Sequence, residues 1–219
     1  MIGSPRLMYE HTNESLEAIT IGLDVQPDDV VLAVCGSGDQ SFALLENAKT
    51  VVSVDKSKVQ LGYAERRAQL LGGGKLDEFL YVRGGEWPDS ILEQRNLYFM
   101  QDGRLGRTAD NLDSLHFVRG DIFAVGLDRQ RRFPEVHFSK VYLSNIVAYY
   151  VTQLKTHYNR LNALSRRLPQ GGLIYISNYD GLETLPNSPA QLHVDERLTM
   201  LARGKENKDW WTPVVYRKI

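Results

Sequence analysis

The chain has 219 residues, of which 42% are hydrophobic and 24% are charged, and its formal net charge is -1. This length and composition predict a single domain, residues 1–219, with a sizeable core, and no apolar run approaches the roughly 18 residues that a membrane-spanning helix needs. The balanced charge argues against nucleic acid as a partner, because the arginine pairs at 66–67, 131–132 and 166–167 lie in separate segments and are explained by solvated helix faces.

The first predicted element is a helix that has Thr12 or Asn13 as its N-cap and ends near Gly22. The run VVLAV at 30–34 is too short for a helix and rich in β-branched residues, so it predicts a strand buried on both faces, as in a parallel sheet. Cys35, the only cysteine, follows this strand and can form no internal disulfide. The N-terminal sequence also lacks a signal-peptide core, and together these features predict a cytoplasmic protein.

The sequence CGSGD at 35–39 predicts a tight turn, because Gly36 and Gly38 leave the backbone open to a ligand. An amphipathic helix follows, and then the β-branched run 50–54, which ends at Asp55. Strand, glycine turn, helix, strand and terminal acid make a nucleotide-binding βαβ unit, in which the acid accepts hydrogen bonds from the ribose hydroxyls. The spacing of 17 residues between Gly38 and Asp55 (55 minus 38) is near the expected value of roughly 20.

The ligand of this unit is predicted to be S-adenosylmethionine (SAM) rather than NAD. Ser41 stands where the dinucleotide fingerprint has its third glycine, and Asp39 directly follows the second glycine. A carboxylate there would repel a pyrophosphate and would suit a ligand with an ammonium or sulfonium charge. No GxxxxGK[ST] phosphate loop occurs in the sequence, which argues against an ATPase. We place Lys56 beside Asp55 in the same cofactor site.

The segment 83–111 interrupts the alternation of strands and helices, after two helices predicted over 57–71 and 76–81. It combines Gly84, Gly85 and Pro88 with three aromatic residues, and is too apolar for a linker but too irregular for one helix. We interpret it as a small helical insertion, which forms either a lid over the site or padding at a sheet edge.

The rest of the chain resumes the alternation and predicts an α/β fold with a Rossmann-like, doubly wound, mostly parallel sheet. Strands are expected at 115–118, 139–145, 173–178 and 213–219, and helices at 151–168 and 190–202. Ligands of such sheets bind outside the carboxyl ends of the strands, where Gly36, Asp55, Asp121 and Asn145 are all expected. The five histidines show no metal-ligand spacing, so no metal site is predicted.

Several segments resemble one family of SAM-dependent enzymes. They are YEH at 9–11 before LEAI, VLAVCGSGD at 31–39, TVVSVD at 50–55, DEFL at 77–80 followed by Gly84, and LSNIVAYY at 143–150. They resemble the S-adenosylmethionine:diacylglycerol 3-amino-3-carboxypropyltransferases of betaine-lipid synthesis and their short relatives, over residues 7–84 and 138–180. The lipid enzymes have a larger helical middle portion, where this chain has only residues 83–111.

The resemblance implies a class I SAM-transferase fold and a role for each matching residue. The methionine moiety would be held by Gly36, Ser37, Gly38 and Asp39, the ribose by Asp55, and the adenine by Asp121 and Ile122. The transferred group would meet the acceptor at Asn145, Tyr149 and Tyr150. Apart from the resemblance, an oxygen acceptor would need a base, and the candidates for it are Glu10, His11 and Tyr149.

Three functions fit these residues. On family grounds we expect transfer of the 3-amino-3-carboxypropyl group of SAM to a small-molecule or lipid-like acceptor, which in the lipid case implies peripheral contact with a membrane. Methyl transfer is the alternative, because the sulfonium activates three carbons and the rotation of the cofactor decides which one faces the acceptor. A SAM-binding protein without catalysis is the third. The acceptor and the oligomeric state are left open.

Overall fold

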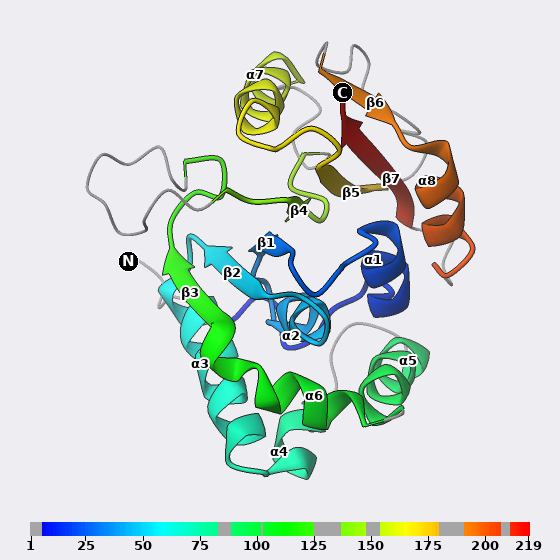
Figure 1. Cartoon of the computed structure of the whole chain (residues 1–219). Coiled ribbons are helices and arrows are strands. Elements are labelled where there is room, and N and C mark those ends of the chain that lie inside the picture. Colours follow the sequence, from blue (N-terminus) through cyan, green and yellow to red (C-terminus); the bar gives the residue numbers. More distant parts are fainter. Residues whose placement is uncertain are drawn as a thin grey trace.

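A mostly parallel sheet forms the centre of the protein. The computed structural model describes residues 6–82, 89–101, 103–124, 137–147, 154–179, 191–206 and 211–219. The strands in these ranges are β1 (Val30–Val34), β2 (Thr50–Asp55), β3 (Leu115–Arg119), β4 (Lys140–Tyr142), β5 (Leu173–Tyr179), β6 (Leu192–Val194) and β7 (Trp211–Lys218). They form one seven-stranded sheet in the order β3-β2-β1-β4-β5-β7-β6 (Figure 1). Strands β1 to β5 pair in parallel, whereas β7 is antiparallel to both β5 and β6.

Helices cover both faces of this sheet. They are α1 (Leu16–Gly22), α2 (Asp39–Leu45), α3 (Lys58–Gly72), α4 (Leu76–Leu80), α5 (Asp89–Met100), α6 (Arg104–Asp110), α7 (Leu154–Ser165) and α8 (Glu196–Arg203). Figure 1 shows α7 on one side of the sheet and α2, α3, α4 and α6 on the other. Among the described helices, none has the length and apolar character needed to cross a membrane.

Adjacent residues of each strand belong to opposite core layers. In β1, Leu32 packs in the layer that contains α7, whereas Val31 and Ala33 pack in the layer that contains α1, α2 and α5. Val51 and Val52 of β2 divide in the same way. Because both faces are covered, β1 is a continuous apolar run in the sequence, and β2 is one apart from Ser53 and its two end residues. The predicted fold class, a Rossmann-like doubly wound α/β sheet, is confirmed.

The N-terminal helix has a different cap from the one expected. Ser15 Oγ accepts a hydrogen bond from the Ala18 N–H (3.2 Å), so Ser15 is the N-cap of α1, rather than Thr12 or Asn13. The Thr12 backbone N–H donates instead to Asp39 Oδ2 (2.8 Å). The residues before α1 are therefore tied to the start of α2.

Two further boundaries differ from the prediction. β4 ends at Tyr142, before the expected residue 145, because Ser144 has a φ of 52°, which an extended strand does not allow. Residues 190–202, expected as one helix, include β6 and then α8. A three-residue strand carries too short a pattern to be recognised, and β6 is held by pairing with β7.

The described part of segment 83–111 belongs to the core. Tyr98 and Phe99 of α5 and Leu105 of α6 are buried in the same cluster as Phe42 of α2. No residue of α5 or α6 lines the cavity described below. These two helices therefore pack against the domain and do not form a lid, and residues 83–88 lie outside the described part of the chain.

Candidate functional site

A cavity of about 300 Å³ lies where the carboxyl ends of the central strands meet. β2 and β3 lie on one side of β1, and β4 and β5 lie on the other, so the cavity is at the switch point where α/β sheets bind ligands. Its lining includes most of the residues predicted to bind the cofactor: Gly36, Ser37, Asp55, Lys56, Asp121, Ile122 and Asn145. Gly38 and Asp39 are not among the lining residues.

The glycine turn brings the main chain to this cavity. Gly36 and Gly38 have φ values of 50° and 90°, in the left-handed region, and the Gly38 N–H closes the turn on the Cys35 carbonyl (2.8 Å). A Cβ at Gly38 would lie 2.9 Å from Phe42 Cε2 and 3.0 Å from Ala64 Cβ. Gly38 is thus required by the close packing of α2 and α3, whereas Gly36 faces the cavity.

We expect Gly38→Ala to destabilise the protein more than Gly74→Ala. Both glycines have positive φ, 90° and 69°, but a Cβ at Gly74 would meet no atom within 4 Å. The comparison therefore separates the effect of crowding from that of backbone strain. Because of overpacking, Gly38→Ala should lower the free energy of unfolding by about 1–3 kcal/mol more than Gly74→Ala does. Urea denaturation measures the difference, and equal losses in the two variants would show that the turn tolerates a side chain.

Asp55 lies at the tip of β2, and its carboxylate is bonded by backbone groups of the described chain. The Ser57 N–H donates to Oδ1 (2.8 Å), and the N–H groups of Gly36 and Lys56 also contribute. Burial raises the pKa of Asp55, while these hydrogen bonds act in the opposite direction. A carboxylate offers about four acceptor positions, so after these three donors about one position is left for a ligand hydroxyl.

Asp121 follows β3 and already has cationic partners. Its Oδ2 lies 2.9 Å from Lys56 Nζ and 4.0 Å from Arg160 Nη2, and its Oδ1 accepts from the Phe123 N–H (3.1 Å). Burial acts to raise the pKa of Asp121, but the hydrogen bond with Lys56 and the other partners outweigh it and lower the pKa. Ile122, which is buried, adds an apolar surface at this end of the cavity.

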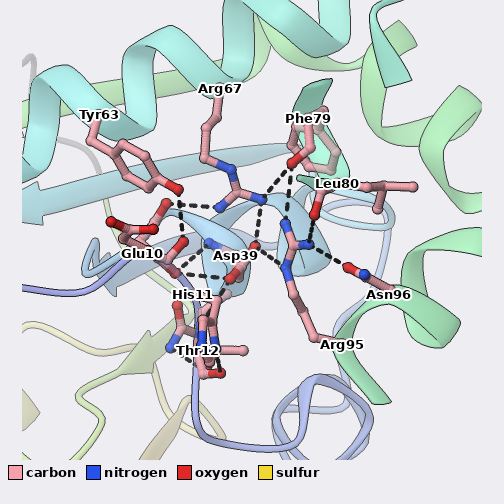
Figure 2. A network of polar contacts seen from close by, with 12 residues as sticks. Glu10, His11, Thr12, Asp39, Tyr63, Arg67, Phe79, Leu80, Arg95 and Asn96 are labelled. Carbon is pink, nitrogen blue, oxygen red and sulfur yellow. Dashed lines mark hydrogen bonds and ion pairs between the residues drawn. The ribbon is translucent and has the colours of Figure 1, made fainter. Parts of the chain in front are cut away.

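Asp39 is fully buried and bonded by two arginines. Its Oδ1 lies 2.7 Å from Arg67 Nη2 and 3.0 Å from Arg95 Nε (Figure 2). Its Oδ2 accepts from the Thr12 N–H (2.8 Å) and from the Ser37 hydroxyl (2.9 Å). Burial acts to raise the pKa of Asp39, but the two guanidinium groups outweigh it and hold the pKa well below its usual range.

This geometry corrects the role expected for Asp39. The prediction was that its carboxylate attracts a ligand cation and repels a pyrophosphate, but Arg67 and Arg95 already neutralise it inside the protein. The charge of Asp39 therefore does not favour SAM over NAD. Asp39 instead fixes the glycine turn to α3 and α5.

Arg67 also corrects the interpretation of the pair at 66–67 as a solvated helix face. Its side chain is only 3% exposed, and its Nη1 donates to the Ser37 carbonyl (3.0 Å). Its guanidinium faces the Phe79 ring, 4.6 Å from the centroid, and that of Arg95 lies 5.7 Å from the same ring. Arg67 is thus a structural residue and is not available to a ligand at the surface.

Glu14 is a cavity residue that sequence reasoning missed. It is 5% exposed and accepts hydrogen bonds from the hydroxyls of Tyr142 (2.8 Å), Ser144 and Ser177. Burial raises the pKa of Glu14, although these three bonds act to lower it. The partners are 128 to 163 residues away in the sequence, so no local pattern could have revealed the cluster.

The predicted catalytic residues are not all brought together. Asn145 and His11 line the main cavity, and His11 Nδ1 lies 2.8 Å from the Thr12 carbonyl. Glu10 lies in a separate hollow beside Tyr63 and α4, and Tyr149 and Tyr150 lie outside the described residues. In the described ranges, no three His, Cys, Asp or Glu side chains are placed to hold a metal ion.

Sequence comparisons identify no relatives for this chain. No protein-family model matches it, and no curated protein matches it. The resemblance to the aminocarboxypropyltransferases of betaine-lipid synthesis is therefore not supported.

Solved structures, in contrast, share the fold. An rRNA methylase from Streptococcus thermophilus is similar with a TM-score of 0.51 and 15% identity, over 100% of this chain and 99% of that chain. TrmN from Thermus thermophilus has a TM-score of 0.56 and 16% identity, over 93% of this chain and 48% of that chain. The [4+2]-cyclase SpnF has a TM-score of 0.53 and 9% identity, over 93% and 79%.

These likenesses show that the chain has the class I methyltransferase fold. Identities of 9–16% carry no information about substrate, and the presence of a cyclase among the similar structures illustrates that one fold supports different reactions. The function must therefore be argued from the residues of the cavity.

Proposed function

We propose that this chain is a SAM-dependent methyltransferase. The observation that carries the proposal is the position of Asp55, at the tip of β2, in the same cavity as Gly36 and Ser37 at the tip of β1. An acid and a glycine turn on neighbouring parallel strands suit the ribose and the chain beyond it in an adenosyl ligand. The class I methyltransferase fold supports the same reading.

The residues of the cavity fit the nucleoside part of SAM. Asp55 would accept a hydrogen bond from a ribose hydroxyl, and Ile122 would pack against the adenine ring. Gly36 leaves the main chain accessible, because a Cβ there would meet only Gln40 Oε1, at 3.9 Å. SAM would supply a methyl group already activated by its sulfonium, so the chain's own residues would need only to hold and orient the reactants.

We expect Asp55→Ala to weaken the binding of S-adenosylhomocysteine by about 5–150-fold, which corresponds to about 1–3 kcal/mol for a ribose hydroxyl left unpaired. Isothermal titration calorimetry measures this change. Glu65→Ala is the matched control, because Glu65 is an exposed acid on α3 and should leave the affinity as in the wild type. An unchanged affinity in the Asp55 variant would remove this residue from the site.

The nucleoside product decides among the candidate reactions. After incubation of the protein with SAM and pools of candidate acceptors, S-adenosylhomocysteine identifies methyl transfer. Methylthioadenosine identifies aminocarboxypropyl transfer, which we keep as the second candidate because it uses the same sulfonium. Binding without either product identifies a non-catalytic SAM-binding protein and contradicts the proposal.

The acceptor pools should include RNA as well as small molecules and lipids. The reason to include RNA is that one similar structure is that of an rRNA methylase. A small-molecule or lipid-like acceptor, as expected from the sequence, is tested in the same experiment.

A further inference from the structure

The end of the cavity formed by β4 contains a buried carboxylate that no described basic residue neutralises. Glu14 lines the cavity beside Tyr142, Ser144 and Asn145. Its hydrogen-bond partners in the described chain are all hydroxyl groups, and none of the described ion pairs includes it. Hydroxyl donors solvate a carboxylate but leave its charge in place, so a cation bound there would gain a full electrostatic interaction.

The carboxylate also has room for one more donor. Oε1 accepts from Tyr142 and Ser144, and Oε2 accepts from Ser177 alone. Since a carboxylate has about four acceptor positions, one position on Oε2 is left. The three hydroxyls hold the group in a fixed orientation, which is the arrangement expected of a binding residue rather than a mobile surface acid.

A second acid, Glu206, is bonded to the residue that follows Glu14 in the sequence. The carboxylate oxygens of Glu206 accept from the Ser15 N–H, each at 3.2 Å. Burial raises the pKa of Tyr175 well above its usual value, and the charges of Glu206 and Glu14 act in the same direction, so both acids act on this part of the protein.

The Glu14 cluster lies on the opposite side of the glycine turn from the nucleoside residues. Asp55 and Asp121 belong to the ends of β2 and β3, whereas the Glu14 partners belong to β4, the turn after it and β5. Adjacent strands are about 4.8 Å apart, so β4 and β5 lie about 5 and 10 Å beyond β1. A ligand whose sugar lies on β2 would therefore leave the β4 side of the cavity free for an acceptor.

We infer that the acceptor is an amine, and that Glu14 binds it as an alkylammonium group at the β4 end of the cavity. The inference rests on the proposed function, because it assigns the β2 and β3 end to the cofactor. It deepens that function by naming the acceptor class and the residue that selects it.

Glu14 would also receive the proton that an ammonium must lose before its nitrogen can react. The proton passes from nitrogen to Glu14 Oε2, which leaves a neutral amine with a free electron pair and a neutral carboxyl group. The nitrogen then forms a bond to the methyl carbon while the bond from that carbon to sulfur breaks, and its electron pair stays on sulfur. Burial, which raises the pKa of Glu14, favours this proton transfer.

Ligand-observed NMR with two probes tests the inference. We expect wild-type protein saturated with S-adenosylhomocysteine to bind n-butylammonium about tenfold or more tightly than n-butanol, since a charged hydrogen bond is worth about 1.5–3 kcal/mol. Glu14→Gln, which keeps the size of the side chain, should reduce this ratio to about one. Glu17→Gln is the matched control, because Glu17 lies on α1 and pairs with Lys205 (3.0 Å).

Three results would overturn the inference. The first is a probe ratio near one in the wild type, which needs no variant and so does not depend on how Glu14→Gln folds. The second is an unchanged ratio in a folded Glu14→Gln protein. The third is a loss of S-adenosylhomocysteine affinity in that variant with unchanged affinity for methylthioadenosine, which would assign Glu14 to the ammonium of the cofactor. If the wild type binds no S-adenosylhomocysteine, the proposed function fails, while the probe ratio measured without it still tests Glu14.

Discussion

Asp39→Ala should lower the free energy of unfolding by about 3–5 kcal/mol, because it leaves two buried guanidinium groups without their carboxylate. Asp39 is 0% exposed, and the side chains of Arg67 and Arg95 are 3% and 1% exposed, so water cannot replace the lost partner. Urea denaturation followed by circular dichroism measures the change. The contribution of this carboxylate to stability is present above the pKa of an unfolded aspartate, about 3.9, and is lost only as the pH falls below it, because the folded pKa is depressed.

An exposed ion pair gives the matched control for this prediction. Lys75 Nζ lies 3.1 Å from Glu78 Oε1, but both side chains are more than half exposed, at 59% and 56%. Glu78→Ala should therefore change the free energy of unfolding by about 0–1 kcal/mol. The contrary result is a loss of stability in Asp39→Ala as small as that in Glu78→Ala, together with a loss of affinity for S-adenosylhomocysteine. It would show that Asp39 binds the ligand, as its position after the glycine turn predicts.

The sequence predicted the strand–turn–helix–strand unit because each part of it is decided locally. The run from Val30 to Val34 is apolar since both faces of β1 are covered, and Gly36 and Asp55 follow their strands directly. Elements that depend on contacts between distant parts of the chain were harder to predict from the sequence. β6 exists because it pairs with β7, and its three residues carry no pattern of their own.

The site shows the same division between local and distant causes. Glycine turns and acids at strand ends can be located from the sequence, and Gly36, Asp55 and Asp121 do meet in one cavity. The charged partners of an acid cannot be predicted in this way when they are distant in the sequence. Asp39 meets Arg67 and Arg95, which are 28 (67 minus 39) and 56 residues away, so its apparent availability for a ligand was wrong. Glu14 precedes a helix cap and has no local sign of its buried hydroxyl partners.

The buried arginines explain why part of segment 83–111 is integral to the fold. Arg95, on α5, bonds Asp39 at the start of α2, and α5 and α6 bury aromatic and apolar side chains against the rest of the core. Arg95, Asp39 and the glycine turn thus form one unit with the cavity, because Ser37 lines the cavity and its hydroxyl donates to Asp39. A loss of packing in this unit should consequently change ligand binding as well as stability.

Phe79→Ala should lower the free energy of unfolding by about 3–5 kcal/mol, as is usual when a buried ring is removed. Phe79 is the one buried residue of the short helix α4, and its ring packs edge-on against Phe42 and Phe99, with centroids 5.3 and 5.4 Å away. The guanidinium groups of Arg67 and Arg95 also face this ring. Its removal leaves a cavity and deprives both cations of a favourable contact.

Two further variants separate these causes. Phe79→Leu keeps most of the buried volume but loses the aromatic face. Its loss in free energy of unfolding should therefore be smaller than that of Phe79→Ala by the free energy of the cavity. Leu76→Ala, at a position of α4 that is 41% exposed, should cost little and controls for the stability of the helix itself. Because Arg67 donates to the Ser37 carbonyl at the cavity, we also expect Phe79→Ala to weaken binding of S-adenosylhomocysteine. Equal losses in the Phe79→Ala and Leu76→Ala proteins would show that the ring does not anchor α4.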